Sequence, residues 1–273
     1  FGLSSIVGPT LGGFITDSLS WHWVFYINIP LGLATIAVFM FFFPHLRPDN
    51  LKHHVDYAGM SALVVCVVPL LLALSWGGVE YPWASAPVIG MLAVSAASGV
   101  LFFIIESRSE EPIIPLNLFK SGIVSVSSIV IFLTGFAMFG SIIFVPLFFQ
   151  GVLGLSATAS GSFLTPMMLG VVLGSLISGQ VLSRAGGHYR LQGVFGLAIM
   201  ALGMVLLSRM NVETSYVNAV LNIVVMGFGL GITMPLYMIA IQNAVPYNVM
   251  GVATSTAAFL RSMGGVFGLA ILG

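Results

Sequence analysis

Long apolar runs separated by short polar segments make up most of the chain. A helix needs about 20 mostly apolar residues to cross a lipid bilayer. The runs are continuous and do not alternate at every second residue, so they predict helices rather than the strands of a membrane barrel. The predicted spans cover residues 1–15, 21–43, 57–76, 86–105, 123–146, 158–182, 191–208, 216–240 and 250–273.

The first and last runs are incomplete at the ends of the sequence. A secretory leader would begin with a positively charged region, but the chain starts directly with apolar sequence, and "GGVFGLAILG" is still apolar at residue 273. We therefore expect a fragment of a longer protein, truncated at both ends.

Composition agrees with many membrane spans. Hydrophobic residues make up 58% of the 273 positions and charged residues only 6%, whereas a soluble domain carries about 25% charged residues. The 8 basic and 8 acidic residues cancel, which argues against a nucleic-acid-binding surface. Cys66 is the only cysteine, and the adjacent His53 and His54 lack further ligands at metal-binding spacing, so neither a disulfide nor a metal cofactor is expected. The predicted fold class is an all-α polytopic membrane protein.

Basic residues predict the orientation, because Lys and Arg are concentrated in cytoplasmic loops. If the polar loop 44–56 lies inside the cell, every second loop after it also lies inside. Only Arg209 then lies outside, and Arg261 lies within a span. The inner loops are 44–56, 106–122, 183–190 and 241–249, with Arg47, Lys52, Arg108, Lys120, Arg184 and Arg190, and the outer span ends carry Trp21, Trp23, Trp76 and Trp83.

Two polar segments divide the chain. "PHLRPDNLKHHVD" at residues 44–56 and "ESRSEEPIIPLNLFKSG" at residues 106–122 flank two almost wholly apolar spans. We interpret residues 44–122 as linkers around an inserted helix pair. Residues 1–43 would then be the last two helices of one bundle, and residues 123–273 the first five helices of a second bundle, the last of them truncated.

The stretch "SIVGPTLGGFI" contains small residues at a spacing of four. Ser4, Gly8 and Gly12 fall on one helix face, with Pro9 and Gly13 beside it. Small residues at this spacing let a neighbouring backbone approach closely, and adjacent helices can satisfy the carbonyl that a proline leaves free. The pattern predicts a tight helix–helix contact bent at Pro9, and the alternative is the ordinary packing of any membrane helix.

The same region carries a family resemblance. "SIVGPTLGGFITDSLSWHWVFYINIPLG" resembles the antiporter signature of the major facilitator superfamily, Gly-Pro-x-x-Gly-Gly, followed by the Trp-x-Trp-x-Phe-x-x-Asn-x-Pro of its fourteen-helix branch of drug:proton antiporters. Two positions depart from the pattern, with Ser4 in place of a common glycine and His22 in place of a common arginine. The matching residues are Gly8, Pro9, Gly12, Gly13, Trp21, Trp23, Phe25, Asn28 and Pro30.

The resemblance extends over nearly the whole chain, from about the fifth helix to the thirteenth. "GQVLSRAGGHYR" is similar to the second copy of the family's conformational loop, matching at Gly179, Arg184 and Gly186, but Ser183 replaces the acid. "GVATSTAAFLRSMGGVFGLAILG" is similar to the thirteenth helix. The resemblance implies two six-helix bundles around an inserted helix pair.

The resemblance also implies a function. It implies that the protein is a monomer. We expect its location to be the cell membrane, and specifically the cytoplasmic membrane of a bacterium. That monomer would export small amphipathic compounds by alternating access in exchange for protons, without a cofactor. The glycine-proline signature and Arg261 would then serve coupling or gating.

Arg261 is the most unusual polar residue. It lies about 10 to 14 residues into its span, roughly 15–20 Å deep, where an arginine costs about 2.5–3.5 kcal/mol. Its partner could be a carboxylate on helices outside this sequence, the substrate, or free backbone carbonyls. Its role could be coupling or gating, or purely structural.

No acidic residue is predicted at comparable depth, although proton coupling needs a titratable group accessible from both sides in turn. Asp17 lies at the outer rim, Asp56 at the inner rim, and Glu106, Glu110 and Glu111 in an inner loop. We expect the main proton-binding acid upstream of this sequence, and Asp17 and Asp56 to anchor span boundaries.

Small residues at the same spacing recur on three later spans, where they predict seams that let helices slide or simply pack closely. An aromatic face and a methionine-rich segment could instead line an apolar substrate pocket, or pack against helices and lipid. The small residues are Gly170, Gly174, Ser178, Gly227, Gly231, Gly264 and Gly268, and the pocket candidates are Phe132, Phe136, Phe139, Met234 and Tyr237.

Other function classes find less support. A membrane-embedded enzyme would need a HExxH, paired-carboxylate or Ser/His arrangement, and an ATP-driven pump would need a GxxxxGK[ST] loop. None of these patterns occurs in the sequence. An uncoupled facilitator or a transporter-like sensor would share the predicted fold.

Overall fold

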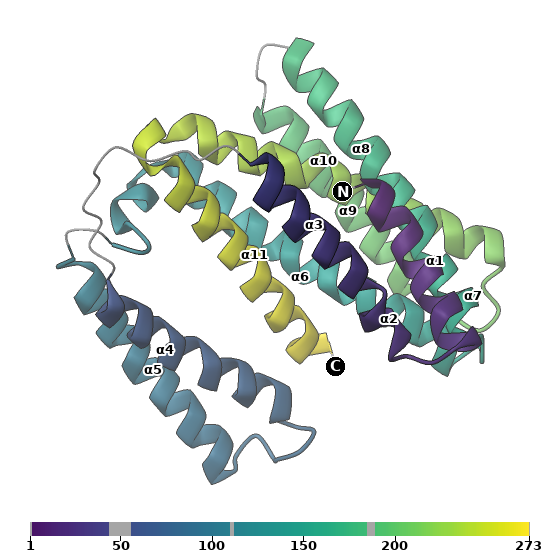
Figure 1. Ribbon diagram of the computed structural model, residues 1–273, viewed down its shortest axis with the longest axis horizontal. Coiled ribbons are helices and arrows are strands. Elements are labelled where there is room, and N and C mark those ends of the chain that lie inside the picture. Colours follow the sequence, from purple (N-terminus) through teal and green to yellow (C-terminus); the bar gives the residue numbers. More distant parts are fainter. Residues whose placement is uncertain (1, 44–55, 110–111, 185–188, 273) are drawn as a thin grey trace. The chain divides into compact units, whose positions relative to one another are not determined.

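The computed structural model describes residues 2–43, 56–109, 112–184 and 189–272 (Figure 1). Each predicted span forms a helix there, and these ranges contain no β-strand. The helices are α1 (Gly2–Ser18), α2 (Trp23–Tyr26), α3 (Asn28–Phe42), α4 (Tyr57–Trp76), α5 (Ala86–Glu106), α6 (Gly122–Gly151), α7 (Ala157–Ser162), α8 (Leu164–Arg184), α9 (Tyr189–Ser208), α10 (Tyr216–Ala244) and α11 (Met250–Leu272), with single 3₁₀ segments η1 (Leu116–Lys120) and η2 (Tyr247–Val249).

Eight helical segments in the described ranges are long and apolar enough to cross a membrane. α1, with 17 residues, is shorter. α6 and α10 reach 30 and 29 residues and continue past their predicted ends, with Pro146 and Pro235 inside them. A membrane helix can retain a proline because its neighbours satisfy the freed backbone groups, so these prolines do not end the helices.

Two predicted spans begin with a separate short helix. α2 leads into α3 through Ile27, and α7 leads into α8 through Phe163. Phe163 is buried and stacks on Phe149, with ring centroids 3.6 Å apart. This aromatic contact ties the α7–α8 junction to the end of α6.

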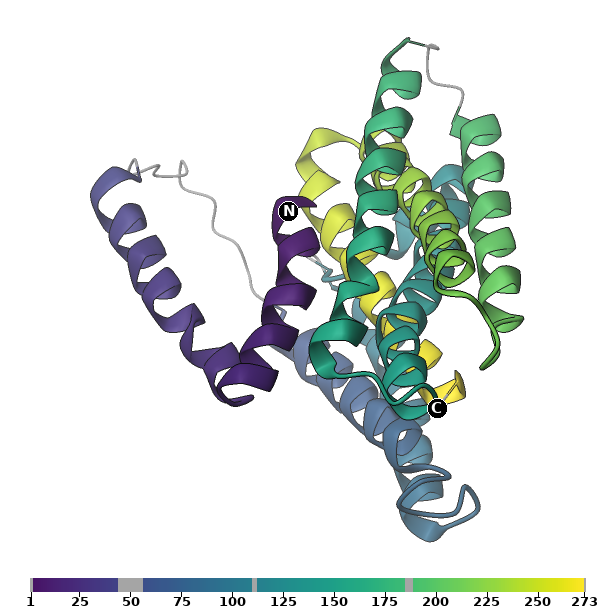
Figure 2. The same cartoon turned by 90° about the vertical axis from the view of Figure 1, so that its right-hand side faces the viewer.

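The described chain forms two compact units, and the first consists of residues 1–51 and 140–236. Its core lies along α8 and α10, where the side chains of Met167, Ile223, Met226 and Leu230 are almost completely buried. α1 packs against α7 and α8. α3 diverges from α1 beyond the α2 turn (Figure 2), and none of its residues is buried.

The second unit consists of residues 52–139 and 237–273. α4 and α5 pack along each other as a hairpin, burying Ala62, Ala73, Val88 and Phe102. α4 and α5 therefore form a pair, and its place as an insertion between two bundles stays a prediction. The first part of α6 and the end of α10 pack with α11 around a buried cluster of Ile131, Ile241, Ala253 and Ala257.

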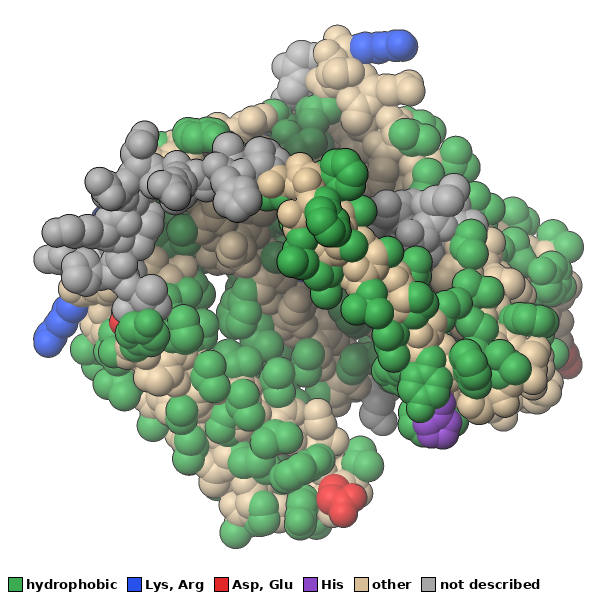
Figure 3. Space-filling view, in the orientation of Figure 1, with side chains coloured by type: hydrophobic (Ala, Val, Ile, Leu, Met, Phe, Trp, Pro, Cys, Tyr) green, Lys and Arg blue, Asp and Glu red, His purple; other side chains and the backbone are tan. Residues whose placement is uncertain are grey.

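Apolar side chains are spread over the helices in the view of Figure 3, and few charged side chains appear on them. Many large hydrophobic residues are exposed on the helices. Such surfaces suit contact with lipid tails, since a soluble protein rarely exposes large continuous apolar patches. The predicted polytopic helical class is confirmed. The three-part division into 1–43, 44–122 and 123–273 stays a prediction.

Candidate functional site

α8 and α10 meet backbone to backbone. A Cβ atom added to Gly170 would lie 2.6 Å from the Val224 carbonyl oxygen, and one added to Gly174 would overlap the next turn of α10. From the other side, Cβ atoms on Gly227 and Gly231 would overlap carbonyl oxygens of α8. The small residues predicted to form seams on these two spans therefore face each other.

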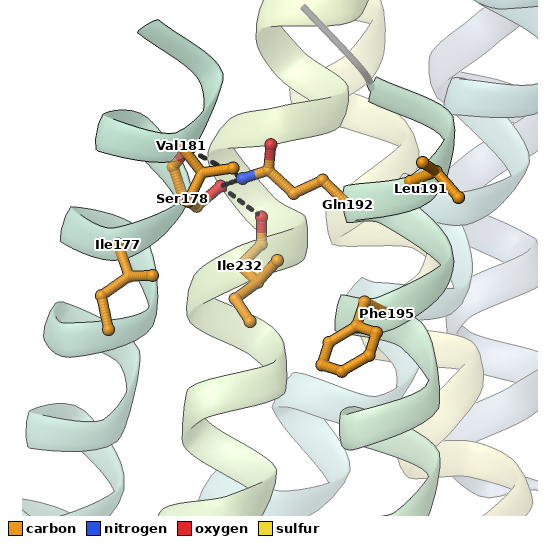
Figure 4. A pocket seen from close by; sticks show the side chains of 7 residues that line it. All are labelled: Ile177, Ser178, Val181, Leu191, Gln192, Phe195 and Ile232. Atoms are coloured by element: carbon orange, nitrogen blue, oxygen red, sulfur yellow. Dashed lines mark hydrogen bonds between the residues drawn. The ribbon is translucent and has the colours of Figure 1, made fainter. Parts of the chain in front are cut away.

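The seam continues as a polar contact between three helices (Figure 4). The Ser178 hydroxyl of α8 donates to the Ile232 carbonyl of α10 at 3.1 Å. Gln192 reaches across from α9, and its Nε2 donates to the Ser178 carbonyl at 2.8 Å and to the Ser178 Oγ at 2.6 Å. Ser175 also donates to the Gly231 carbonyl at 3.1 Å. These bonds hold α8, α9 and α10 together near the C-terminal end of α8.

A largely apolar groove with a volume of about 510 Å³ opens beside this contact. In Figure 4, Gln192 bridges from α9 to Ser178 across α10, between the apolar side chains of the two flanking helices. Leu191 and Phe195 are 72% and 70% exposed, so the groove opens on the outer face of α8 and α9. This α8–α9 groove is lined by Ile177, Ser178, Val181, Leu191, Gln192, Phe195 and Ile232.

Sequence reasoning did not find the α8–α9 groove or the glycines of α9. Gly196 packs against Ile232 and Thr233, and Gly203 against Met226. Gly196 and Gly203 are seven residues apart, which places them on the same helix face. This spacing could have indicated a close helix contact. No signal in the sequence predicts the Gln192–Ser178 contact, because a single glutamine gives no indication of its distant partner.

The predicted aromatic face on α6 packs against α11. Cβ atoms on Gly264 and Gly268 would overlap the backbone of Phe132 and Phe136, and the Phe139 ring lies over Gly265. This agrees with the packing alternative for the aromatic stripe and places the Gly264–Gly268 spacing in a second seam. Substrate contact by these phenylalanines stays a prediction.

The two residues proposed with them on α10 lie elsewhere. Tyr237 is half-buried and packs, with Met238, against the cluster around Ile131 and Ile241. Met234 is half-buried. None of the five predicted pocket residues lines the α8–α9 groove, and their role in binding also stays a prediction.

Arg261 lies in the middle of α11 and is half-buried. Its carbonyl faces Gly135 of α6, where a Cβ atom would overlap it. Within the described part of the chain, no hydrogen bond or ion pair reaches its guanidinium group. The partner of Arg261 therefore stays a prediction.

The glycine-proline signature lies on α1. Cβ atoms on Gly8 and Gly12 would meet no described atom within 4 Å, so the tight contact expected there is not made with any described helix. Instead, the hydroxyls of Thr10 and Thr165 lie 2.8 Å apart. Pro9 and Gly13 lie within the same continuous helix, and the gating role of these four residues stays a prediction.

Asp17 anchors a span boundary, as expected. Its Oδ2 accepts hydrogen bonds from the Thr158 backbone N–H at 2.8 Å and from the Thr158 hydroxyl at 2.5 Å. The bond to the first turn of α7 supplies an acceptor to one of the free N–H groups at a helix start. Asp17 therefore joins the C-terminal end of α1 to α7.

The predicted conformational loop is only partly described. Gly179 and Arg184 lie at the end of α8, and a Cβ atom on Gly179 would meet open space. Arg184 borders a smaller hollow beside the α8–α9 groove. Gly186 lies outside the described residues, as do Arg47, Lys52, His53, His54, Glu110 and Glu111.

The apolar spans, the prolines inside long helices and the glycine-packed helix pairs define part of a polytopic α-helical membrane protein. The sequence pattern of the Major Facilitator Superfamily matches residues 1–269, and the chain belongs to this family of transporters. Its location is the cell membrane.

Curated relatives align along all or nearly all of the chain. It is 40% identical over 273 residues to the multidrug transporter protein MdtP of Bacillus subtilis and 41% identical over 276 residues to multidrug resistance protein 3 of the same organism. The MFS-type efflux pump MFS1 of Arthroderma benhamiae is 33% identical over 275 residues, covering 97% of this chain. The chain spans about half the length of these relatives, covering 50%, 53% and 51% of them.

Proposed function

We propose that the whole protein exports small amphipathic or hydrophobic compounds by alternating access, in exchange for protons. The observation that carries this proposal is the identity of about 40% over the full chain with two relatives named for multidrug transport and resistance. One fold hosts many functions, so the match over the whole chain supports the proposal more strongly than the helical architecture.

Two features of the described structure support export. The α8–α10 seam joins backbones through glycines, and such smooth contacts permit one rigid helix group to move against another, as alternating access requires. The α8–α9 groove offers a largely apolar surface with one polar bridge, a composition typical of small-molecule sites. Proton exchange is proposed because an exporter that works against a gradient needs a coupled ion, and the resembling branch uses protons.

Export is tested with the full-length protein in a bacterial host that lacks its own efflux pumps. Cells loaded with a fluorescent dye such as ethidium are energised, and the loss of fluorescence is followed with and without a protonophore. A proton antiporter lowers the dye content below that of vector-only cells and loses this effect when the proton gradient collapses.

The alternatives give different results. An uncoupled facilitator speeds dye movement in both directions, and the protonophore does not change it. A transporter-like sensor moves no dye. Either result would refute proton-coupled export, whereas gradient-dependent dye loss supports it.

A further inference from the structure

Two acidic side chains meet at one end of the α4–α5 hairpin. Asp56 is the residue before α4, and Glu106 is the last residue of α5. Glu106 is only 3% exposed. Trp76 and Trp83 lie at the opposite end of the same hairpin, so by the predicted orientation the acids lie at the end that faces the cell interior.

Each carboxylate uses one oxygen for a structural hydrogen bond. Asp56 Oδ1 accepts from the Gly59 backbone N–H at 2.7 Å and so caps the start of α4. Glu106 Oε1 accepts from the Ile114 backbone N–H and so holds the segment that follows α5. These bonds fix the positions of both carboxyl groups.

Among the residues that the structure describes, the other two oxygens have no such partner. Asp56 Oδ2 and Glu106 Oε2 are buried, and neither makes a hydrogen bond with any described residue. Both border the same point, because a Cβ atom on Gly59 would lie 2.7 Å from Asp56 Oδ2 and 3.2 Å from Glu106 Oε2. Gly59 is buried and leaves room for the two oxygens to approach each other.

Two carboxylates whose buried oxygens border the same glycine disfavour being charged together unless a positive group lies between them, because like charges in a shared site repel. Buried acceptors without donors are also destabilising. The occupant must therefore be small and must supply a hydrogen bond or a positive charge to both oxygens.

A proton meets these requirements better than a metal ion. Hard cations take six or more oxygen ligands, and the described residues contain no group of three or more His, Cys, Asp or Glu side chains that could hold a metal. A single O–H···O bond would satisfy both free oxygens at once. The helix ends also favour an unequal pair, since the start of α4 stabilises a negative Asp56 and the end of α5 disfavours a negative Glu106.

We propose that Asp56 and Glu106 form a proton-binding site, in which Glu106 carries one proton and donates it in a hydrogen bond to Asp56 Oδ2. Asp56 faces Glu106 across Gly59. On the neighbouring segments Tyr57 and Arg108 are exposed, and the charged residue of α11, Arg261, lies at mid-helix. The site lies in the helix pair, and the proposal does not depend on the direction or substrate of transport.

The bound proton makes the stability of the hairpin depend on pH. The folded hairpin holds a proton that a free glutamate in an unfolded chain has already released well below neutral pH. The folded state then binds more protons than the unfolded state, so its stability decreases as pH rises. The proton would also keep the segment at Ile114 attached to α4 and α5.

The first test is infrared spectroscopy of the purified full-length protein during a pH titration. The wild-type protein should show a carboxylic acid C=O band that shifts in D₂O and disappears at high pH. Glu106→Gln should remove the contribution of one buried acid from this band, which appears as a difference between the wild-type and variant spectra. The matched control is Glu80→Gln, which alters an exposed acid at the opposite end of the hairpin and should leave the band unchanged.

The second test uses a double-mutant cycle on thermal unfolding as a function of pH. Glu106→Gln keeps an oxygen for Ile114 and offers its amide N–H to Asp56, and Asp56→Asn keeps the cap and offers its N–H to Glu106. Each single variant should therefore stay as stable as the wild type at low pH and lose the pH dependence attributed to one proton. The double variant places two amide donors against each other, so its Tm should fall below the value that additivity of the singles predicts.

Four outcomes would overturn the proposal. They are a C=O band of unchanged intensity in both single variants, an unchanged pH dependence in Glu106→Gln, additive effects in the double variant, and a Tm that depends on added Na⁺ or Mg²⁺ rather than on pH. The last of these would identify a cation site in place of a proton site.

Discussion

Replacing Gly231 with alanine probes the close contact between α8 and α10. Gly231 lies against Val171 of α8, whose carbonyl oxygen an added Cβ atom would overlap and whose carbonyl carbon and Cα would lie 2.8 and 2.9 Å away. Ordinary contacts between carbon atoms are about 3.5–4.0 Å. The two helices would therefore have to separate by about 1 Å.

The expected cost follows from two opposing effects. Forcing extra volume into a packed interface costs about 1–3 kcal/mol, and the 3.1 Å hydrogen bond from Ser175 to the Gly231 carbonyl would be stretched as well. Against this, alanine in place of glycine within a helix stabilises by about 0.5–1 kcal/mol. We expect the packing cost to exceed the backbone gain, so Gly231→Ala should be destabilised by about 1–2 kcal/mol and its Tm should fall by several degrees.

The assay is thermal unfolding of the full-length protein in a mild detergent, with Gly90→Ala as the matched control. Gly90 lies inside α5, and a Cβ atom there meets nothing within 4 Å, so this variant should be as stable as the wild type or slightly more stable. If Gly231→Ala instead behaves like Gly90→Ala, the close α8–α10 contact does not exist in the protein.

Three further changes test the site. Gln192→Leu removes the bonds to Ser178 and should lower stability by about 1 kcal/mol while altering the dye range exported, whereas unchanged stability would contradict the three-helix contact. Arg261→Ala should abolish gradient-dependent dye export at normal expression, and Arg261→Lys should retain part of it; full export by the alanine variant would leave only a structural role. Asp17→Ala loses its bonds to Thr158 and should cost about 1 kcal/mol in unfolding experiments, while Asp17→Asn, still an acceptor, should cost less.

The apolar periodicity of the sequence was sufficient to place the helices. A run of about 20 apolar residues in lipid can satisfy its backbone only as a helix, and α4 has the limits predicted for it, residues 57–76. The main differences are at helix ends. α6 extends beyond its expected limit because Pro146 did not end it, and α10 ends at Ala244 rather than at residue 240.

The contacts between helices were less predictable from the sequence than the helices themselves. The spacing of Gly170, Gly174, Gly227 and Gly231 predicted close contacts, but the spacing could not tell which helix each face would meet. The same kind of spacing at Gly8 and Gly12 has no partner among the described helices. A small residue permits a close approach, but only the packing of the chain brings a neighbour to it.

The acidic residues show the same difference. In the sequence, Glu106 belongs to a polar inner loop and Asp56 to a span boundary, about 50 residues away. Each position alone therefore predicts an ordinary solvated charge. In the structure they lie on either side of Gly59, with buried oxygens that accept no hydrogen bond from any described residue. Their burial depends on how α4 and α5 are aligned in the hairpin, and neither helix contains that information alone.

By itself, then, the sequence determined that the chain crosses the membrane repeatedly, where its helices lie and which family it resembles. These properties depend on local hydrophobicity and on short motifs, which neighbouring residues encode. The tertiary structure decided which glycines touch, where the α8–α9 groove opens and that two distant carboxylates share one site. Those properties depend on contacts between residues far apart in the chain, which form only when the helices pack.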